Sequence, residues 1–314
     1  MTTPNEVFVG IDVSKATNEV AIFAQDGVES FANNPTGHRA LANFLEPLEP
    51  TLIVIEATGG LERDLASHLL ETGFAVAVVN PTRVRDFAKA LGRYAKNDPI
   101  DAHTLAHFAQ AIRPEVRQLQ SAQEAELLAL VRRRRQVVAN IGQERNRLHT
   151  VPAKAKKYIQ DHLAYLQAQL QVLNAEIDAL IQAIPQWRQK AQLLCSVPGI
   201  GPVNAFTLLA ELPELGSVSR QKIAALAGVA PYDKDSGKKK GRRKTFGGRY
   251  GVRSTFYMAV LAAIRHNPII KRFYERLIKN GKEHKVAMVA CMRKLLSIAN
   301  VMLMRGEAWR SAAN

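Results

Sequence analysis

The stretch "EVFVGIDVSKATNEVAIF", residues 6–23, decides the fold of the N-terminal part of the chain. Its first ten residues form an apolar run that is rich in β-branched side chains and ends in polar residues, which predicts a buried strand. Residues 18–23 predict a second strand and residues 27–34 a weaker third one, with Gln25, Asp26 and Gly27 as turn residues between them. Three successive strands with short turns indicate the antiparallel part of a sheet.

Helices and strands alternate after these strands. The spacing of apolar residues predicts helices over 37–48, 61–73 and 81–91, strands over 51–60 and 74–80, and another helix that begins near Asp98. This order of elements is that of a ribonuclease-H-like sheet. Periodicity by itself supports a mixed α/β domain.

The pattern changes between residues 121 and 184, where two long helices are predicted on either side of Pro152. Apolar residues from Leu163 to Ile184 recur at alternating spacings of three and four, which is a heptad seam. The two helices can pack as a hairpin in one chain or pair between chains. The run "RRRR", 132–135, cannot face a single partner helix, so Arg132 and Arg133 lie either on a solvated face or on a ridge that contacts phosphates.

After Pro185 the pattern predicts a compact helical region, with helices near 219–228, 249–265, 268–280 and 283–304. The stretch "CSVPGIGPVNAFTLLAEL", 195–212, places a Pro-Gly-x-Gly turn between two apolar helices, as in a helix-hairpin-helix element. Gly199 and Gly201 would let a DNA backbone approach the free N–H groups of the following helix. The alternative is a plain corner between helices.

Charge is unevenly distributed along the chain. The net charge is +15, but residues 1–115 contain 9 Lys and Arg against 15 Asp and Glu, whereas residues 116–314 contain 34 against 13. A basic excess of this size favours a nucleic-acid partner, and the contacts with it should come from the second part.

The expected compartment is a reducing cytoplasm. The N-terminal residues have no signal-peptide pattern, and no apolar run approaches the roughly 18–20 residues of a membrane span. Cys195 and Cys291 have no CxxC partner, and we expect both to be buried as small apolar residues.

Four carboxylates are candidates for a metal site. Asp12 lies in the first strand, Glu56 ends another, and Asp98 and Asp101 are three residues apart at the start of a helix. A carboxylate in a buried strand is costly unless it is paired or bound to metal, and oxygen ligands suit Mg²⁺ or Mn²⁺. Two such ions can clamp a phosphodiester undergoing in-line displacement. The plainer alternatives are that Asp98 caps its helix and that Asp12 is a paired acid at a strand end.

Two further features are weaker. His103 and His107 are four residues apart on the helix after Asp101, but no third ligand accompanies them, so we expect helix surface or an outer layer of the site. The segment "SGKKKGRRKTFGG", 236–248, has Ser236 at its head and Gly237, Gly241, Gly247 and Gly248 to give it freedom. Its six basic residues would hold a polyanion, although a solvated turn is the plain reading. They are Lys238, Lys239, Lys240, Arg242, Arg243 and Lys244.

Five stretches, "GIDVSK", "EATGG", "KNDPIDA", "PGIGPVNA" and "LAGVAPYDKDSGKKKGRR", occur in an order that resembles the DEDD transposases of the insertion-sequence one-ten family, which includes Piv-type invertases. The resemblance covers residues 6–305. It implies a RuvC-like metal-binding domain over 1–118, a coiled-coil connector over 119–186 and a C-terminal transposase domain over 187–314.

The resemblance also implies roles for single residues. Asp12, Glu56, Asp98 and Asp101 would bind Mg²⁺ or Mn²⁺, and Ser236 would attack DNA to form a 5′-phosphoserine link. A structured guide RNA would specify donor and target DNA, and the protein would act at the nucleoid of a bacterium as a dimer or tetramer. A metal-dependent junction nuclease that uses water would not need Ser236, and a non-catalytic nucleic-acid-binding protein would need none of the acids.

Overall fold

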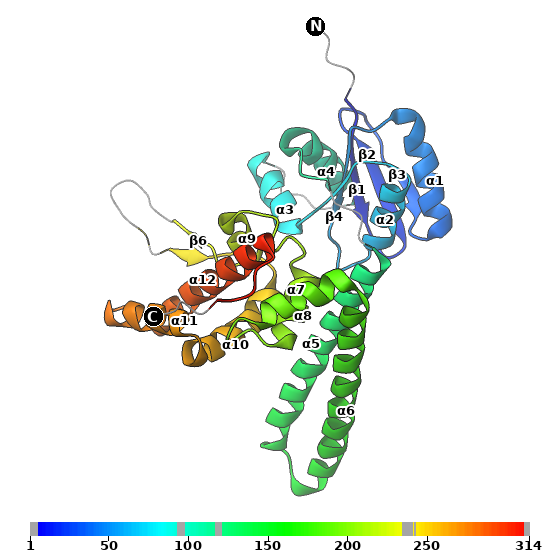
Figure 1. Ribbon diagram of the computed structural model, residues 1–314. Helices are drawn as coiled ribbons and strands as arrows, with labels where there is room; N and C mark the ends of the chain where they lie inside the picture. Colours follow the sequence, from blue (N-terminus) through cyan, green and yellow to red (C-terminus); the bar gives the residue numbers. More distant parts are fainter. Residues whose placement is uncertain (1–5, 93–97, 117–120, 234–240, 242, 311–314) are drawn as a thin grey trace. The chain divides into compact units, whose positions relative to one another are not determined.

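The structure is a computed structural model that describes residues 6–92, 98–116, 121–233, 241 and 243–310, without the side chains of residues 98–100. The chain divides into two compact units, residues 1–121 and 122–314, here called the N-terminal and C-terminal units (Figure 1). The two long helices after residue 121 belong to the second of these compact units.

The N-terminal unit is built on one five-stranded sheet. Its strands are β1 (Phe8–Val13), β2 (Thr17–Ile22), β3 (Glu29–Ala32), β4 (Leu52–Glu56) and β5 (Val76–Val79), in the order β3-β2-β1-β4-β5. The first three strands pair antiparallel, β4 pairs parallel with β1, and β5 pairs parallel with β4. The predicted mixed α/β domain is therefore confirmed, and this order is compatible with the ribonuclease-H-like arrangement.

Helices cover both faces of this sheet. They are α1 (Pro35–Leu45), a short 3-10 helix (Glu46–Leu48), α2 (Arg63–Glu71), α3 (Pro81–Ala90) and α4 (Asp98–Ile112). Val9 and Ile11 pack with Leu41 of α1 and Leu65 of α2 on one face. On the other face, Phe8 packs with the α3 and α4 side chains Val84, Leu105 and Phe108. The alternation of β1 side chains thus separates two apolar layers.

The C-terminal unit begins with a helical hairpin of α5 (Ala122–Leu148) and α6 (Ala153–Ala183). Near the connecting turn Ile141 packs with Leu163, and at the far end Leu127 packs with Ile181, so the helices run antiparallel (Figure 1). Of the two arrangements that the sequence allows, the structure contains the one within a single chain.

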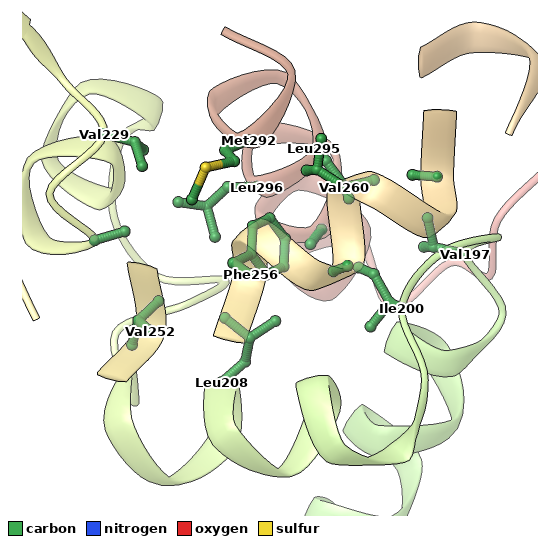
Figure 2. Close-up of a cluster of buried hydrophobic side chains, with 14 of the residues drawn as sticks. Val197, Ile200, Leu208, Val229, Val252, Phe256, Val260, Met292, Leu295 and Leu296 are labelled. Atoms are coloured by element: carbon green, nitrogen blue, oxygen red, sulfur yellow. The ribbon is translucent and has the colours of Figure 1, made fainter. Parts of the chain in front are cut away.

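A helical bundle follows the hairpin. It comprises α7 (Pro185–Cys195), α8 (Pro202–Glu211), α9 (Arg220–Leu226), α10 (Tyr250–His266), α11 (Pro268–Lys279) and α12 (His284–Arg305). Figure 2 shows Phe256 of α10 among Leu208 of α8, Leu296 of α12 and other buried side chains. Two short strands, β6 (Pro231–Tyr232) and β7 (Lys244–Thr245), pair antiparallel beside the bundle and were not predicted.

Two expectations from the sequence are wrong: that no segment is long and apolar enough to span a membrane, and that both cysteines are buried. Helix α12 is long and apolar enough to cross a membrane, with a mean hydropathy of 1.6 over an 18-residue window, but Met288, Cys291 and Leu295 lie buried in the bundle core. Cys291 is buried as predicted, whereas Cys195 is exposed. In α7 the side chains of Ala191 and Leu194 face the core, and the next position is rotated by about 100°.

Candidate functional site

Asp12 and Glu56 lie beside each other at one edge of the sheet. Ile11 of β1 is in register with Ile55 of β4, and the two acids are the next residues on these parallel strands. Both belong to the alternate series that includes Phe8, so their side chains face the layer that contains α4. Both are half-buried. The strand register therefore brings together the two acids that the sequence places on separate strands.

Helix α4 packs closely against β1 because Gly10 has no side chain. A Cβ atom at this position would lie 2.2 Å from the backbone nitrogen of Ala106 and 2.3 Å from the carbonyl oxygen of Ala102. At the other end of α4, the guanidinium of Arg113 donates to both carboxylate oxygens of Glu6 at 2.9 and 2.6 Å. Helix α4 therefore runs antiparallel to β1.

This direction brings the start of α4 toward the end of β1 where Asp12 lies. Asp101 directly precedes Ala102, which is the residue that faces Gly10. Asp98 is the first residue of α4, and its side chain lies outside the described residues. Among the described residues there is no group of three or more His, Cys, Asp or Glu able to hold a metal ion. The structure therefore brings Asp12 and Glu56 together and places Asp101 at the end of α4 that approaches them, and the four-acid metal site stays a prediction.

Glu19 is an acid at this edge that sequence reasoning missed. It lies directly opposite Asp12 in the antiparallel pair of β1 and β2, so the two side chains share a face of the sheet. The hydroxyl of Ser30 donates to Glu19 at 2.7 Å. Like charges opposite each other destabilise a sheet unless a cation or hydrogen bonds compensate. This residue could not be identified from the sequence without the register between β1 and β2, which the sequence analysis did not predict.

Glu62 holds the turn that follows Glu56. This side chain is 6% exposed, and its carboxylate accepts hydrogen bonds from the backbone N–H groups of Thr58 at 3.0 Å and Gly60 at 2.9 Å. Gly59 and Gly60 have positive φ angles of 65° and 110°, which explains the glycine pair in "EATGG". In the sequence Glu62 looks like an ordinary acid near the start of a helix, and no pattern marks it.

Of the two histidines of α4, His107 differs from the helix-surface expectation, and the expectation for His103 stays a prediction. The ring of His107 packs between Phe23, at a centroid distance of 5.3 Å, and Phe87, at 5.2 Å. It therefore fills an aromatic cluster beside the sheet and is not a helix-surface residue.

In the C-terminal unit, Ser236 lies outside the described residues, as do Lys238, Lys239, Lys240 and Arg242. The base of this segment is described. Tyr232 of β6 pairs with Lys244 of β7, and Arg243 forms an ion pair with Asp233. The serine segment is therefore bounded on both sides by a short antiparallel ladder.

The last glycine of this segment, Gly248, has a packing role, which corrects the expectation that it only provides freedom. Gly247 and Gly248 have positive φ angles of 67° and 75°. A Cβ on Gly248 would lie 2.1 Å from the backbone nitrogen of Gly228. The next residue, Arg249, donates to Glu214 at 2.6 Å, so the end of the segment is fixed to the bundle.

Three of the four arginines of 132–135 have different partners, in agreement with the expectation that the run cannot face a single helix. Arg134 donates to Asn174 of α6 at 2.7 Å, and burial lowers the pKa of its guanidinium. Arg135 forms an ion pair with Glu211 of α8, a side chain that is buried. Arg133 is exposed and bonds within its own helix to Gln136. Arg134 and Arg135 thus connect α5 to other helices of the unit, which leaves Arg132 and Arg133 as candidates for phosphate contact.

The turn between α7 and α8 contains one closely packed glycine. Gly199 has a φ of 107°, and a Cβ there would lie 2.5 Å from the Cβ of Ala263 in α10. Gly201 precedes α8 as its N-cap, and a Cβ there would meet nothing within 4 Å. Packing therefore requires the first glycine, whereas the second faces open space.

Comparison with known proteins finds a transposase family model that matches part of each unit. Residues 9–152 match a family model described as a transposase, and residues 191–275 match one described as transposase IS116/IS110/IS902 family. The chain belongs to the IS110 family of transposases. This member is 29% identical to the pilin gene-inverting protein of Moraxella bovis, over 95% of this chain and 96% of that protein. It is 24% identical to a putative transposase of Sinorhizobium fredii, over 97% of this chain and 86% of the relative.

These likenesses make the protein a DNA recombinase or transposase of an insertion-sequence family, and DNA is its substrate. They extend over the sheet that carries the acids and over the bundle that flanks the serine segment.

Proposed function

We propose that this transposase cuts and exchanges DNA strands through a covalent link between Ser236 and a 5′-phosphate. The observation that carries the proposal is the register of β1 and β4, which places Asp12 and Glu56 side by side on the face covered by α4. Two half-buried carboxylates at adjacent positions repel each other unless a cation compensates. A DNA substrate also favours the cytoplasm and the nucleoid as the place of action.

The donor set suits a hard divalent cation. Carboxylate oxygens from two strands and from the start of a helix are ligands that Mg²⁺ and Mn²⁺ accept, and they contain no soft sulfur ligand. Asp12, Glu56, Asp98 and Asp101 would hold the ion, with Glu62 keeping the turn after Glu56 in place. When bound, such an ion supplies positive charge at the scissile phosphate and favours loss of a hydroxyl proton.

The chain's own residues account for the exchange. The Oγ of Ser236 forms an ester bond to phosphorus, its proton passes to solvent or a nearby base, and the bond to the 3′ oxygen breaks. That oxygen takes up a proton and leaves as a 3′-hydroxyl. The number of phosphate ester bonds is unchanged, so the 3′-hydroxyl of another strand can reverse the step without ATP. Arg243 and Lys244, with the basic residues between them and Ser236, would hold the polyanion.

Three further features belong to this proposal. A structured guide RNA would select donor and target, and the basic C-terminal unit has the charge to bind it. The turn at Gly201 would act as a helix-hairpin-helix contact with the DNA backbone, since the N-terminus of α8 has open space beside it. The α5–α6 hairpin would act as a coiled-coil connector between a catalytic and a transposase domain, and it would support a dimer or tetramer.

A trapped covalent adduct tests the proposal. The full chain, purified with the RNA that accompanies it, is mixed with Mg²⁺ and a nicked duplex that carries the element junction, and the products are separated on a denaturing gel. We expect a protein–DNA band that Ser236→Ala and Asp12→Ala abolish. Ser217→Ala and Asp26→Ala, which alter an exposed serine and an exposed acid, should leave the band unchanged.

The other outcomes distinguish the alternatives. Free cleaved ends that survive Ser236→Ala but not Asp12→Ala would show a nuclease that uses water. Binding without cleavage, unchanged by either substitution, would show a non-catalytic binding protein. Treatment with ribonuclease before the DNA is added tests the guide, because an RNA-guided reaction stops and an RNA-independent one continues.

A further inference from the structure

A cleft of about 790 Å³ lies in the C-terminal unit between α9, β6, α11 and α12. Its walls combine small apolar side chains with aromatic rings. The charged residues that line it are cationic, and no Asp or Glu is among its lining residues in the part of the chain that the structure describes. The cationic residues are Arg220, Arg293 and Lys294. This combination of an apolar slot and positive charge suits a flat, anionic ligand.

Phe273 fixes cations at one end of this cleft. The ammonium of Lys294 lies 4.5 Å from the centre of the Phe273 ring, and the guanidinium carbon of Arg276 lies 5.3 Å from it. A second hollow of about 310 Å³ shares Phe273 and Lys294 with the cleft and adds Arg272. Because the ring itself packs against the bundle core, the cations are attached to a rigid support. The positive lining therefore continues past the cleft as a track.

Tyr232 is an exposed aromatic residue of the cleft and does not line the second hollow. Its side chain is 48% exposed and lines the cleft from β6. Ser236 follows it four positions later in the sequence, a length that spans at most about 14 Å when fully extended. An exposed aromatic ring beside a basic track is the arrangement with which proteins stack an unpaired base and hold the adjoining phosphates.

We propose that this cleft binds an unpaired deoxynucleotide of the DNA substrate. The base lies against Tyr232 and the alanine wall formed by Ala225 and Ala290, while the flanking phosphates meet Arg293 and Lys294. DNA is the occupant because it is the substrate of this family. That the bound strand is the one joined to Ser236 rests on the function proposed above. The binding itself does not.

Binding to single-stranded DNA provides the first test. Fluorescence anisotropy of the full chain with a labelled 12-nucleotide strand gives the Kd of each variant. Tyr232→Ala should weaken binding about 5- to 150-fold, because stacking on one base is lost, and Tyr232→Phe should bind like the wild type. A blunt duplex of the same length should respond much less, since its bases are already stacked. An unchanged Kd for Tyr232→Ala overturns the proposal.

Paired charge variants provide the control. Arg293→Gln with Lys294→Gln should lower the slope of log Kd against log salt by about 1.4, as expected for two phosphate contacts to a single strand. Lys190→Gln with Lys279→Gln removes the same charge from exposed positions outside the cleft and should change the slope less. Equal effects of the two pairs would show diffuse attraction and would contradict the site. Thermal unfolding of every variant checks that it is folded.

Cross-linking locates the strand. A strand with a 5-iodo-deoxyuridine should, on irradiation, label the peptide that contains Tyr232, in the wild type and equally in Ser236→Ala. Labelling of that peptide supports the cleft even if the wild type forms no covalent adduct through Ser236, so the failure of this inference and the failure of the proposed function can be told apart. A label elsewhere refutes the site. An equally long RNA that carries 5-iodo-uridine gives the contrary test. If this RNA displaces the DNA at a lower concentration and itself labels the peptide that contains Tyr232, the cleft is an RNA site and the proposal is overturned.

Discussion

Gly10→Ala is the substitution whose consequence the structure defines most closely. The new methyl would lie 2.2 Å from a backbone nitrogen and 2.3 Å from a carbonyl oxygen of α4, whereas carbon atoms in good contact are about 3.5 Å apart. Because both neighbours are backbone, no side chain can rotate away. Helix α4 must therefore move from β1 by roughly 1 Å, and overpacking of this kind costs about 1–3 kcal/mol.

Scanning calorimetry of the full chain measures the cost. For a unit of 121 residues, about 4 °C of Tm is lost for each kcal/mol, so we expect the N-terminal transition to fall by roughly 4–12 °C. Gly142→Ala is the matched control, because Gly142 lies in α5 and a Cβ there meets nothing within 4 Å. It should stabilise its helix by about 1 kcal/mol.

The same substitution should reduce catalysis beyond its effect on stability. Helix α4 carries Asp101, and displacing it relative to Asp12 should lower the yield of the covalent adduct at temperatures where the variant is fully folded. A displacement of about 1 Å can cost about 100-fold in rate. A Gly10→Ala protein that melts within 1 °C of the wild type and forms the adduct at the same rate would refute the packing argument.

Two other predictions concern single contacts. Glu62→Ala should lower adduct yield and Tm together, because two backbone N–H groups of the turn lose their acceptor at about 1–3 kcal/mol each, and Glu62→Gln should recover part of both. If the alanine variant behaves like the wild type, the turn does not depend on this carboxylate. In native protein, N-ethylmaleimide should label Cys195 and leave Cys291 unlabelled until denaturant is added, since Cys291 is buried and burial raises its pKa to about 11. Rapid labelling of Cys291 in the folded protein would contradict the position of α12.

Most elements of this fold follow from local pattern. The strand over residues 6–15 appears as Phe8–Val13, and the helix expected near 283–304 appears as His284–Arg305. Strands β6 and β7 were missed because two residues each are too few for any periodicity. The burial of Cys291 in α12 was predicted, whereas the membrane-like length and hydropathy of this helix were not, since a core helix and a membrane helix have similar composition and differ in what packs around them.

The site is harder to predict than the fold. Asp12 and Glu56 stand out because a carboxylate in an apolar strand is unusual, and their adjacency then follows from strand order. Glu19 requires the register of a hairpin as well. Glu62 is indistinguishable from a surface acid until its burial and its two N–H partners are known.

The distribution of charge gives the two parts of the chain different tasks. Residues 1–115 have an excess of six acidic residues, so this part repels DNA, although it holds the carboxylates proposed for the chemistry. Residues 116–314 have an excess of 21 basic residues and can supply the attraction, through the cleft at Tyr232 and the segment that begins at Ser236. A cation at the acids would offset the local repulsion as well as assist the reaction. DNA affinity should therefore depend mainly on the C-terminal unit, while entry of a phosphate into the acid site should depend on the metal.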